Sequence, residues 1–337
     1  MKLVLVTALL LFLAGAAPAN AAGIDCTKAE SPREKMICNN PKLLKLDADM
    51  ANLYAERLAR LSPEGQKAQR NVQVGWLAYM SKVCNTSAAP DAKSAERCLN
   101  SIYGRRLRDL NELGISKGPY VFNNIVIYAA EPAPLNDRSG EAPGFYSLHV
   151  SYPQIDNVKT RQAESFNKKI VRKDSIARSC DGNGNGDVSA GFVIGAAAEN
   201  LVAVEDGHGE YCHGDAHGYD ESNGKIIEFS QESRELDILE VFGPEMNWQT
   251  KLSHLVDEAI SFGDPADDKK DVRDTIIQGS MRLSNWFITR EGFQRETSSY
   301  DGGCYACRVD VKTIPWSDIK PLLPPNSPLW RFINNAN

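Results

Sequence analysis

One short segment of the sequence gathers residue types that bind zinc in other proteins. Residues 208–217 hold three of the five histidines together with one cysteine and two carboxylates, namely His208, Glu210, Cys212, His213, Asp215 and His217. Zinc prefers such nitrogen, sulfur and oxygen ligands, but the common zinc motifs have a different spacing. Because Cys212 is also needed for a disulfide and Ala216-His217-Gly218 is typical of a turn in a sheet, we expect no metal site. A metal-dependent hydrolase built on this segment remains an alternative.

A second segment is similar to the opening of a calcium-binding loop. In Asp181–Gly186, oxygen ligands stand at positions 1, 3 and 5 and glycine stands at position 6. The twelfth position holds Phe192 in place of the bidentate glutamate. The favoured interpretation is therefore a turn rich in Gly and Asn, with calcium at Asp181–Asp187 as the alternative and no other cofactor expected.

The sequence contains no local motif for catalysis. It has no nucleophile elbow, phosphate-binding loop, His-Glu-x-x-His or paired-carboxylate motif. A Ser-His or Glu-Glu site assembled from distant positions would leave no such motif. We therefore expect a protein that is not an enzyme and that acts by binding.

The N-terminal 22 residues have the pattern of a secretory signal peptide. Lys2 precedes an apolar run over residues 3–17, and small residues follow up to Ala22. No cysteine lies at the cut, which argues against a lipid anchor, and no later stretch reaches the roughly 18 apolar residues of a membrane span. We expect a periplasmic or secreted protein without a membrane anchor.

The eight cysteines form two sets of four along the chain. They are Cys26, Cys38, Cys84 and Cys98, followed by Cys180, Cys212, Cys304 and Cys307. An even number in an exported protein favours disulfides, and each set allows three pairings. The shortest loops predict the pairs Cys26–Cys38, Cys84–Cys98, Cys180–Cys212 and Cys304–Cys307. The gap between the sets predicts two stapled domains, residues 23–114 and 115–337.

Apolar periodicity and turn residues predict a helical first domain and a mixed second one. Helix start signals before Pro32, Pro41 and Pro63, and a stop at Gly114, indicate a bundle of four helices. In the second domain we expect strands over 120–128, 145–152 and 192–204, helices over 158–179 and 248–262, and a hairpin over 285–297. Asn223-Gly224 is typical of a two-residue hairpin turn. This mixture without regular βαβ alternation predicts the α+β class.

The first domain resembles the LprI-like lysozyme-inhibitor N-terminal domain over residues 24–113. The resemblance rests on the ordered Cys-Cys-Trp-Cys-Cys framework and on the run Arg70-x-x-Gln73-x-x-Trp76-Leu77. The family name implies inhibition of lysozyme. Our chain lacks the lipid-anchoring cysteine of the mycobacterial parent, so the resemblance carries no membrane attachment.

The second domain resembles the RsiV/PdaC-like domain from about residue 120 onward. The matching pieces are short: residues 152–155, Phe166-Asn167, residues 214–218, 223–225 and 238–242, Gly292 with Tyr300, and residues 314–319. In a lysozyme-sensing anti-sigma factor this domain grips lysozyme, whereas in peptidoglycan deacetylases it accompanies a separate catalytic domain that is missing here. The family loop after Tyr300 carries a Pro-Tyr pair, and Tyr305 matches its tyrosine. Tyr305 and Tyr300 are therefore candidates for partner contact.

Charge is distributed unevenly along the chain. Residues 23–114 contain 15 Lys and Arg against 11 Asp and Glu, while residues 115–337 contain 22 against 33. No Lys or Arg lies between Arg178 and Lys225, a segment with nine acids. This argues against nucleic-acid binding and favours a cationic partner, for which Asp206, Glu210 and Asp215 are candidate contacts.

Together these patterns predict a binding protein of the cell envelope. The favoured hypothesis is a protein that docks lysozyme or a similar cationic cell-wall hydrolase and inhibits it by steric occlusion of its cleft. The alternative is an envelope sensor or scaffold that binds peptidoglycan or another protein without inhibiting it.

Overall fold

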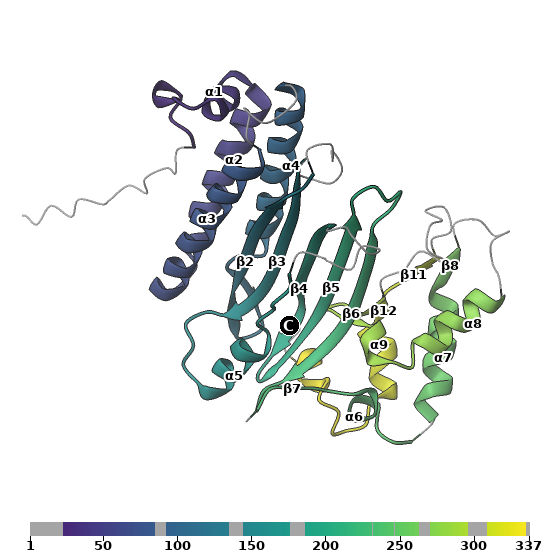
Figure 1. Cartoon of the computed structure of the whole chain (residues 1–337). Coiled ribbons are helices and arrows are strands. Elements are labelled where there is room, and N and C mark those ends of the chain that lie inside the picture. The colour runs from purple at the N-terminus through teal and green to yellow at the C-terminus, as the bar shows by residue number, and fades with distance from the viewer. Residues whose placement is uncertain are drawn as a thin grey trace, which may run out of the picture.

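The computed structural model describes residues 23–84, 92–134, 144–175, 186–230, 232–245, 247–262, 270–295 and 309–334 (Figure 1). The predicted signal peptide lies outside these ranges. Helices occupy the N-terminal part and mixed sheets with helices follow, so the predicted α+β class is confirmed. None of the described helices is long and apolar enough to cross a lipid bilayer.

Four helices form the N-terminal part, which we call the helical unit. They are α1 (Pro32–Asn39), α2 (Pro41–Leu58), α3 (Pro63–Val83) and α4 (Ala92–Asn111), and a short 3-10 turn, η1 (Cys26–Lys28), precedes them. The first three begin at a proline, as predicted, because Ser31, Asn40 and Ser62 cap the free amides of the first turn. Glu34 completes a capping box by accepting the Ser31 amide at 2.8 Å.

Two disulfides staple the helical unit. Cys26–Cys38 and Cys84–Cys98 span 12 and 14 residues of sequence, which confirms both predicted pairs. Cys212 is also disulfide-bonded. Its predicted partner Cys180 and the predicted pair Cys304–Cys307 lie outside the described residues. Structural disulfides are typical of secreted and periplasmic proteins, which is compatible with the predicted export.

The core of the helical unit continues into the neighbouring sheet. Trp76 of α3 is fully buried and meets Tyr103 of α4 edge to face, with ring centroids 5.4 Å apart. Tyr79 of the same helix packs against Tyr128 of strand β2, and Ala130 of that strand belongs to the same apolar cluster. The helices therefore bury their apolar face partly against the sheet.

Buried polar contacts fix the angle between the helical unit and the sheet. Gln69 of α3 donates to the side chain of Asn123 and to the carbonyl of Asn124, both at 2.6 Å. At the start of α3, the amide and hydroxyl of Ser62 donate to the carboxylate of Asp156 at 2.6 and 2.8 Å. Because an unmade hydrogen bond at a buried group is costly, these contacts specify one arrangement.

A seven-stranded sheet forms the middle of the molecule. Its order is that of the sequence: β1 (Ile115–Lys117), β2 (Tyr120–Pro132), β3 (Phe145–Ile155), β4 (Gly186–Ala198), β5 (Leu201–Cys212), β6 (Tyr219–Glu228) and β7 (Arg234–Glu235). All pairs are antiparallel except β3 with β4, which are parallel. A parallel pair needs a crossover, and α5 (Arg161–Lys169) lies in it. Phe166 of α5 is fully buried against Phe122 and Phe229.

Two predicted elements of this region differ in detail from the structure. The segment predicted as one strand over 192–204 is a hairpin, because Asn200 adopts a left-handed conformation (φ 55°) between β4 and β5. Within the described residues of the predicted helix over 158–179, only α5 is helical, and residues 171–175 are not. Residues 176–179 lie outside the described ranges.

Asn223-Gly224 is not the predicted hairpin turn. Both residues lie inside β6, where Gly224 pairs with Glu205 of β5. A Cβ at Gly224 would stand 1.7 Å from the carbonyl oxygen of Trp286, so glycine is required by close packing and not by a turn. The actual β5–β6 turn contains Gly214 with a φ of 99°.

The C-terminal part packs helices and short strands against one half of the same sheet (Figure 1). Its elements are α6 (Ile238–Phe242), α7 (Asn247–Ala259), β8 (Ile260–Phe262), α8 (Lys270–Gly279), η3 (Leu283–Asn285), β9 (Phe287–Ile288), β10 (Gly292–Gln294), β11 (Val309–Val311), β12 (Ile314–Pro315), α9 (Trp316–Ile319), η4 (Lys320–Leu322) and α10 (Trp330–Asn334). The β9–β10 pair confirms the predicted hairpin. The predicted helix over 248–262 ends at Ala259, because Ile260–Phe262 pair with β11.

Candidate functional site

Strand β5 divides its residues between the two faces of the sheet. Side chains alternate along a strand, so Asp206, His208 and Glu210 project to one face while Gly207 and Gly209 lie on the other. The acidic segment identified in the sequence is therefore a row of charges on one face of an ordered strand.

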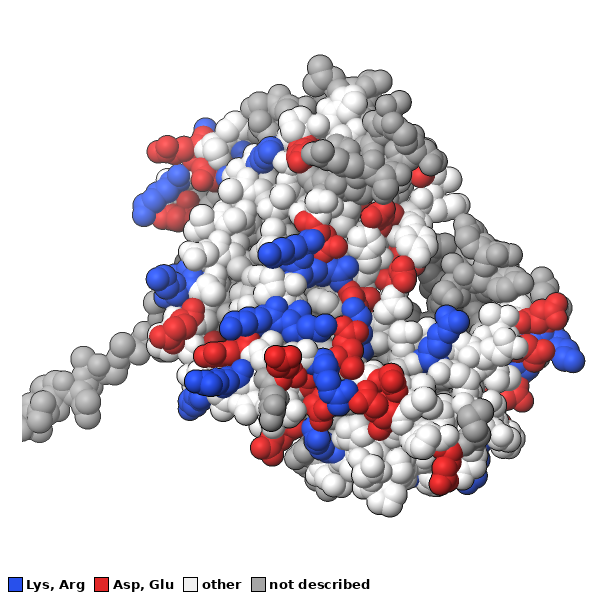
Figure 2. All heavy atoms as spheres, turned by 60° about the horizontal axis from the view of Figure 1, so that its bottom comes forward, with Lys and Arg blue, Asp and Glu red and all other residues white. Residues whose placement is uncertain are grey.

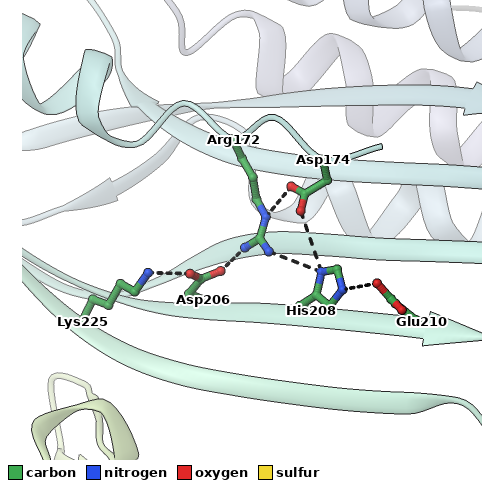
Figure 3. Close-up of polar contacts among 6 residues, drawn as sticks. All are labelled: Arg172, Asp174, Asp206, His208, Glu210 and Lys225. Atoms are coloured by element: carbon green, nitrogen blue, oxygen red, sulfur yellow. Dashed lines mark hydrogen bonds and ion pairs between the residues drawn. The ribbon is translucent and has the colours of Figure 1, made fainter. Parts of the chain in front are cut away.

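Arg172 and Lys225 meet the first of these acids (Figure 3). Arg172 follows α5 in the crossover, and its guanidinium contacts the Asp206 carboxylate through Nη1. Lys225 Nζ of β6 lies 2.6 Å from the other oxygen of Asp206. Arg172 Nε also lies 2.6 Å from Asp174 Oδ2. The side chains of Arg172 and Asp206 are only 14% and 18% exposed, so water screens these pairs weakly.

His208 continues the same row (Figure 3). Its Nε2 lies 2.9 Å from Glu210 Oε1, and its Nδ1 lies 3.8 Å from Asp174 Oδ1 and 3.5 Å from Arg172 Nη2. We name these six residues the charge ladder, because acids alternate with basic side chains along it: Lys225, Asp206, Arg172, Asp174, His208 and Glu210.

An aromatic ring supports the charge ladder from within the sheet. Arg172 Cζ and Lys225 Nζ lie 5.4 and 5.7 Å from the ring centroid of Phe192 in β4. A cation over an aromatic face is attracted by the ring, and the ring restricts where the cation can lie. Phe192 therefore holds both cations over Asp206, which has its charge satisfied inside the molecule.

The end of the β5–β6 hairpin presents acids of a different kind. Asp215, Tyr219, Asp220 and Glu221 are all exposed, and Tyr219 is 61% exposed, which is high for a large aromatic side chain. We call these four residues the acidic hairpin surface. It lies at the upper end of the sheet in Figure 1, away from β7.

Local hydrogen bonds organise the acidic hairpin surface. The Glu221 carboxylate accepts from Asn223 at 2.7 Å and from the Tyr219 hydroxyl at 3.1 Å. These two bonds, from Asn223 first and then from Tyr219, hold the pKa of Glu221 below its ordinary value. The same contact raises the pKa of Tyr219. Both bonds favour the ionised form of Glu221, and one of them ties the tyrosine hydroxyl to this carboxylate.

At the opposite end of the sheet, the described charges of both signs are mixed. Figure 2 shows Lys and Arg side chains interspersed with Asp and Glu there. Among them, Arg234 binds Glu228 and Glu240 at 2.8 and 2.5 Å, and Arg331 also binds Glu228 at 3.0 Å. Glu228 is only 14% exposed and is neutralised by both arginines, so it offers little attraction for a cationic protein.

The histidines of the segment 208–217 do not converge. His208 belongs to the charge ladder, whereas the His213 ring packs 4.8 Å from the Tyr146 ring and its Nε2 lies 3.4 Å from Asp187 Oδ2. His217 is exposed in the turn. Among the described residues, no group of three or more His, Cys, Asp or Glu could hold a metal ion.

The predicted calcium segment is described only from Gly186 onward; residues 181–185 lie outside the described ranges. Asp187 lies in β4, where it accepts hydrogen bonds from the backbone and the hydroxyl of Ser147 at 2.8 and 2.7 Å. Its carboxylate thus joins β4 to β3.

The predicted contact residues have different environments in the structure. Asp206 is paired with two cations and Glu210 with His208, whereas Asp215 is exposed. Tyr300 and Tyr305 lie outside the described residues. Sequence reasoning missed Arg172, Asp174 and Lys225. The one available signal was Lys225, which is the first cation after the acidic segment that has no Lys or Arg.

Comparison with known proteins gives likenesses of fold only. No family model and no curated protein matches the chain. A member of the DUF3298 family from Bacteroides fragilis has 15% sequence identity and a TM-score of 0.41, over 65% of our chain and 100% of its own. A DUF3298 family protein from Pseudomonas aeruginosa has 13% identity and a TM-score of 0.40, over 62% and 97%. The LprI-like and RsiV/PdaC-like resemblances stay predictions.

Proposed function

We propose that this protein is a periplasmic or secreted binding protein that docks a lysozyme or a similar cationic cell-wall hydrolase through the acidic hairpin surface. The observation that carries the proposal is the exposure of Asp215, Asp220 and Glu221 around Tyr219, in a segment that has no Lys or Arg.

Charge and shape have separate tasks in this proposal. The acids attract a cationic enzyme and raise the rate of encounter, while a desolvated tyrosine supplies contact area at low entropic cost. Asp206 is satisfied by Arg172 and Lys225, so the charge ladder stiffens the strand behind the hairpin and leaves docking to the hairpin end.

The hairpin end would inhibit by occlusion. It follows the last pair of β5 and β6, Glu210 with Tyr219, so the sheet anchors its base. A rigid element seated in the substrate cleft of a hydrolase excludes the glycan strand, and inhibition then requires no chemistry from this chain.

The test is a titration of a cationic lysozyme with the purified full chain, with binding and cleavage of cell-wall substrate measured in parallel. We expect inhibition that weakens as salt increases. Tyr219→Ala should cost about 2 kcal/mol, or roughly 30-fold in Kd. Asp215→Asn with Asp220→Asn should slow association.

The matched control changes the same number of charges elsewhere. Glu232 and Glu245 are exposed acids outside the hairpin, and their conversion to Gln should leave the association rate nearly unchanged. If both double variants changed the association rate equally, the net charge of the protein, and not the position of the acids on the hairpin, would explain the effect. Binding without inhibition would favour the envelope sensor or scaffold, and no binding at micromolar excess would end the proposal.

A further inference from the structure

The side chains of Asp109, His149 and Ser189 meet on the sheet face that α4 covers. His149 of β3 is in register with Tyr128 of β2 and with Ser189 of β4. Asp109 of α4 reaches this row from above. In the sequence, Asp109 and His149 are 40 residues apart, as are His149 and Ser189. The three residues therefore form no local sequence motif.

The contacts run in the order serine, histidine, aspartate. Ser189 Oγ lies 3.5 Å from His149 Nδ1, and His149 Nε2 lies 2.9 Å from Asp109 Oδ1. Because an ionised carboxylate only accepts hydrogen bonds, Asp109 fixes the ring proton on Nε2. In the neutral form of the imidazole, the lone pair of Nδ1 then faces the serine hydroxyl, which is the arrangement that a general base needs.

Asp109 is itself held in place. The Tyr128 hydroxyl donates to Asp109 Oδ2. Burial first, and then the Asp109 charge, raise the pKa of Tyr128 well above its ordinary value, so the hydroxyl keeps its proton. The side chains of Asp109 and His149 are 8% and 12% exposed, which strengthens their interaction relative to one in water.

Ser189 differs from its partners because it is exposed, although β4 is a central strand. Its register partner on β5 is Gly209, and the next pair along is Gly191 with Gly207. A Cβ at Gly207 would meet no atom closer than 3.8 Å, so packing within the chain does not require glycine there. A strand glycine beside open space is typical of a position where a ligand approaches the backbone.

We infer that Ser189 is a nucleophile toward acyl esters, with His149 as its general base and Asp109 as the positioning residue for His149. Ser189 Oγ attacks the ester carbonyl as its proton passes to His149 Nδ1. The alcohol leaves with that proton, and water, activated by the same imidazole, then releases the acid and regenerates the serine.

The surroundings of Ser189 restrict the substrate class. Gly207 of β5 leaves room for a short acyl group, whereas Ser151 Oγ lies 2.2 Å from the Cβ position of Gly191 and so limits the space over β4. Asp220 Oδ1 lies where a side chain of Gly209 would begin, 2.3 Å from that Cβ position, so a carboxylate stands beside the serine. An uncharged or cationic ester with a small acyl group fits, and an anionic one is disfavoured by repulsion.

The test is labelling of the full chain with a fluorophosphonate, which forms a serine Oγ–P bond as fluoride leaves. Mass spectrometry of the intact protein and its peptides should place one adduct on Ser189. His149→Gln should slow labelling and p-nitrophenyl acetate hydrolysis by about 100-fold. Ser261→Ala is the matched control, because Ser261 is an exposed serine on strand β8, outside this group, and its replacement should leave both rates unchanged.

Thermal melting of each variant keeps the outcomes separate. Should His149→Gln unfold, Ser189→Ala still decides the matter, since an exposed hydroxyl can be removed without disturbing the core. Absence of a Ser189 adduct on the wild-type chain overturns the inference, as does equal labelling of a folded His149→Gln variant. Neither result depends on lysozyme binding, so this inference and the proposed function stand or fall separately.

Discussion

The carboxylate of Asp206 lies between the guanidinium of Arg172 and the ammonium of Lys225, and both cations rest over one phenylalanine ring. Removal of this one charge would leave two cations facing each other in a partly buried place. We expect Asp206→Asn to destabilise the protein by about 1–3 kcal/mol in urea unfolding.

The control for Asp206→Asn is a variant that removes an acid from a solvent-exposed ion pair. Asp49 pairs with Lys45 one turn away on α2, and both side chains are largely exposed. Asp49→Asn should therefore cost no more than about 0.5 kcal/mol. Equal costs at the two positions would show that the charge ladder has no special stability.

Two Gly→Ala variants should have opposite effects on stability, because one glycine is required by close packing and the other only adds freedom to the unfolded backbone. Gly224→Ala places a Cβ 1.7 Å from the Trp286 carbonyl oxygen, and we expect a loss of about 3 kcal/mol because the backbone of the C-terminal part must move. Gly75 lies in the middle of α3 with nothing within 4 Å of its Cβ position. Gly75→Ala should stabilise the protein by about 0.5–1 kcal/mol. Thermal melts of the two variants should shift in opposite directions.

The disulfide of Cys84 and Cys98 closes a loop in the helical unit. Replacement of both cysteines by serine should cost about 3 kcal/mol, because the unfolded chain gains the freedom that a short cross-linked loop lacks. Chemical denaturation of the variant and of the wild-type chain, each under non-reducing conditions, measures the difference. An unchanged midpoint would contradict this prediction.

The pKa of Glu221 reports on the acidic hairpin surface. Its hydrogen bonds lower the folded pKa, so this contribution to stability is present above the unfolded pKa and is lost as the pH falls through the folded one. Asn223→Ala removes the largest cause, and Tyr219→Phe removes the next. Each should raise the Glu221 pKa in an NMR titration, the first by more. Unchanged titration would mean that the hairpin end is loosely arranged.

Local signals predicted the helical unit well because each signal acts within one turn. Ser31, Asn40 and Ser62 cap the helices that they precede, and the short loops between cysteines gave the right pairs. Asn223-Gly224 was misinterpreted because a turn and a close approach of another segment both require glycine, and only the packing of Trp286 distinguishes them.

The groups that could act chemically come from long-range pairing, which the sequence does not display. Arg172 reaches Asp206 only because the crossover brings the residues after α5 across the face of β5. Asp109, His149 and Ser189 meet only because β3 and β4 pair in parallel under α4. The sequence identified Asp206 and Glu210 as acids, but not that cations of the same chain would neutralise Asp206.

Because the helical unit and the sheet share a core, the protein chain cannot be cut between them without exposing apolar side chains. A fragment that stops at Gly114 would lose β2 and uncover the flank of α3 that carries Tyr79, and it would leave Gln69 without Asn123. Such a fragment should self-associate or precipitate. The two parts are therefore not interchangeable modules, and a recombination event that joined this helical unit to another sheet would have had to carry β2 and β3 with it.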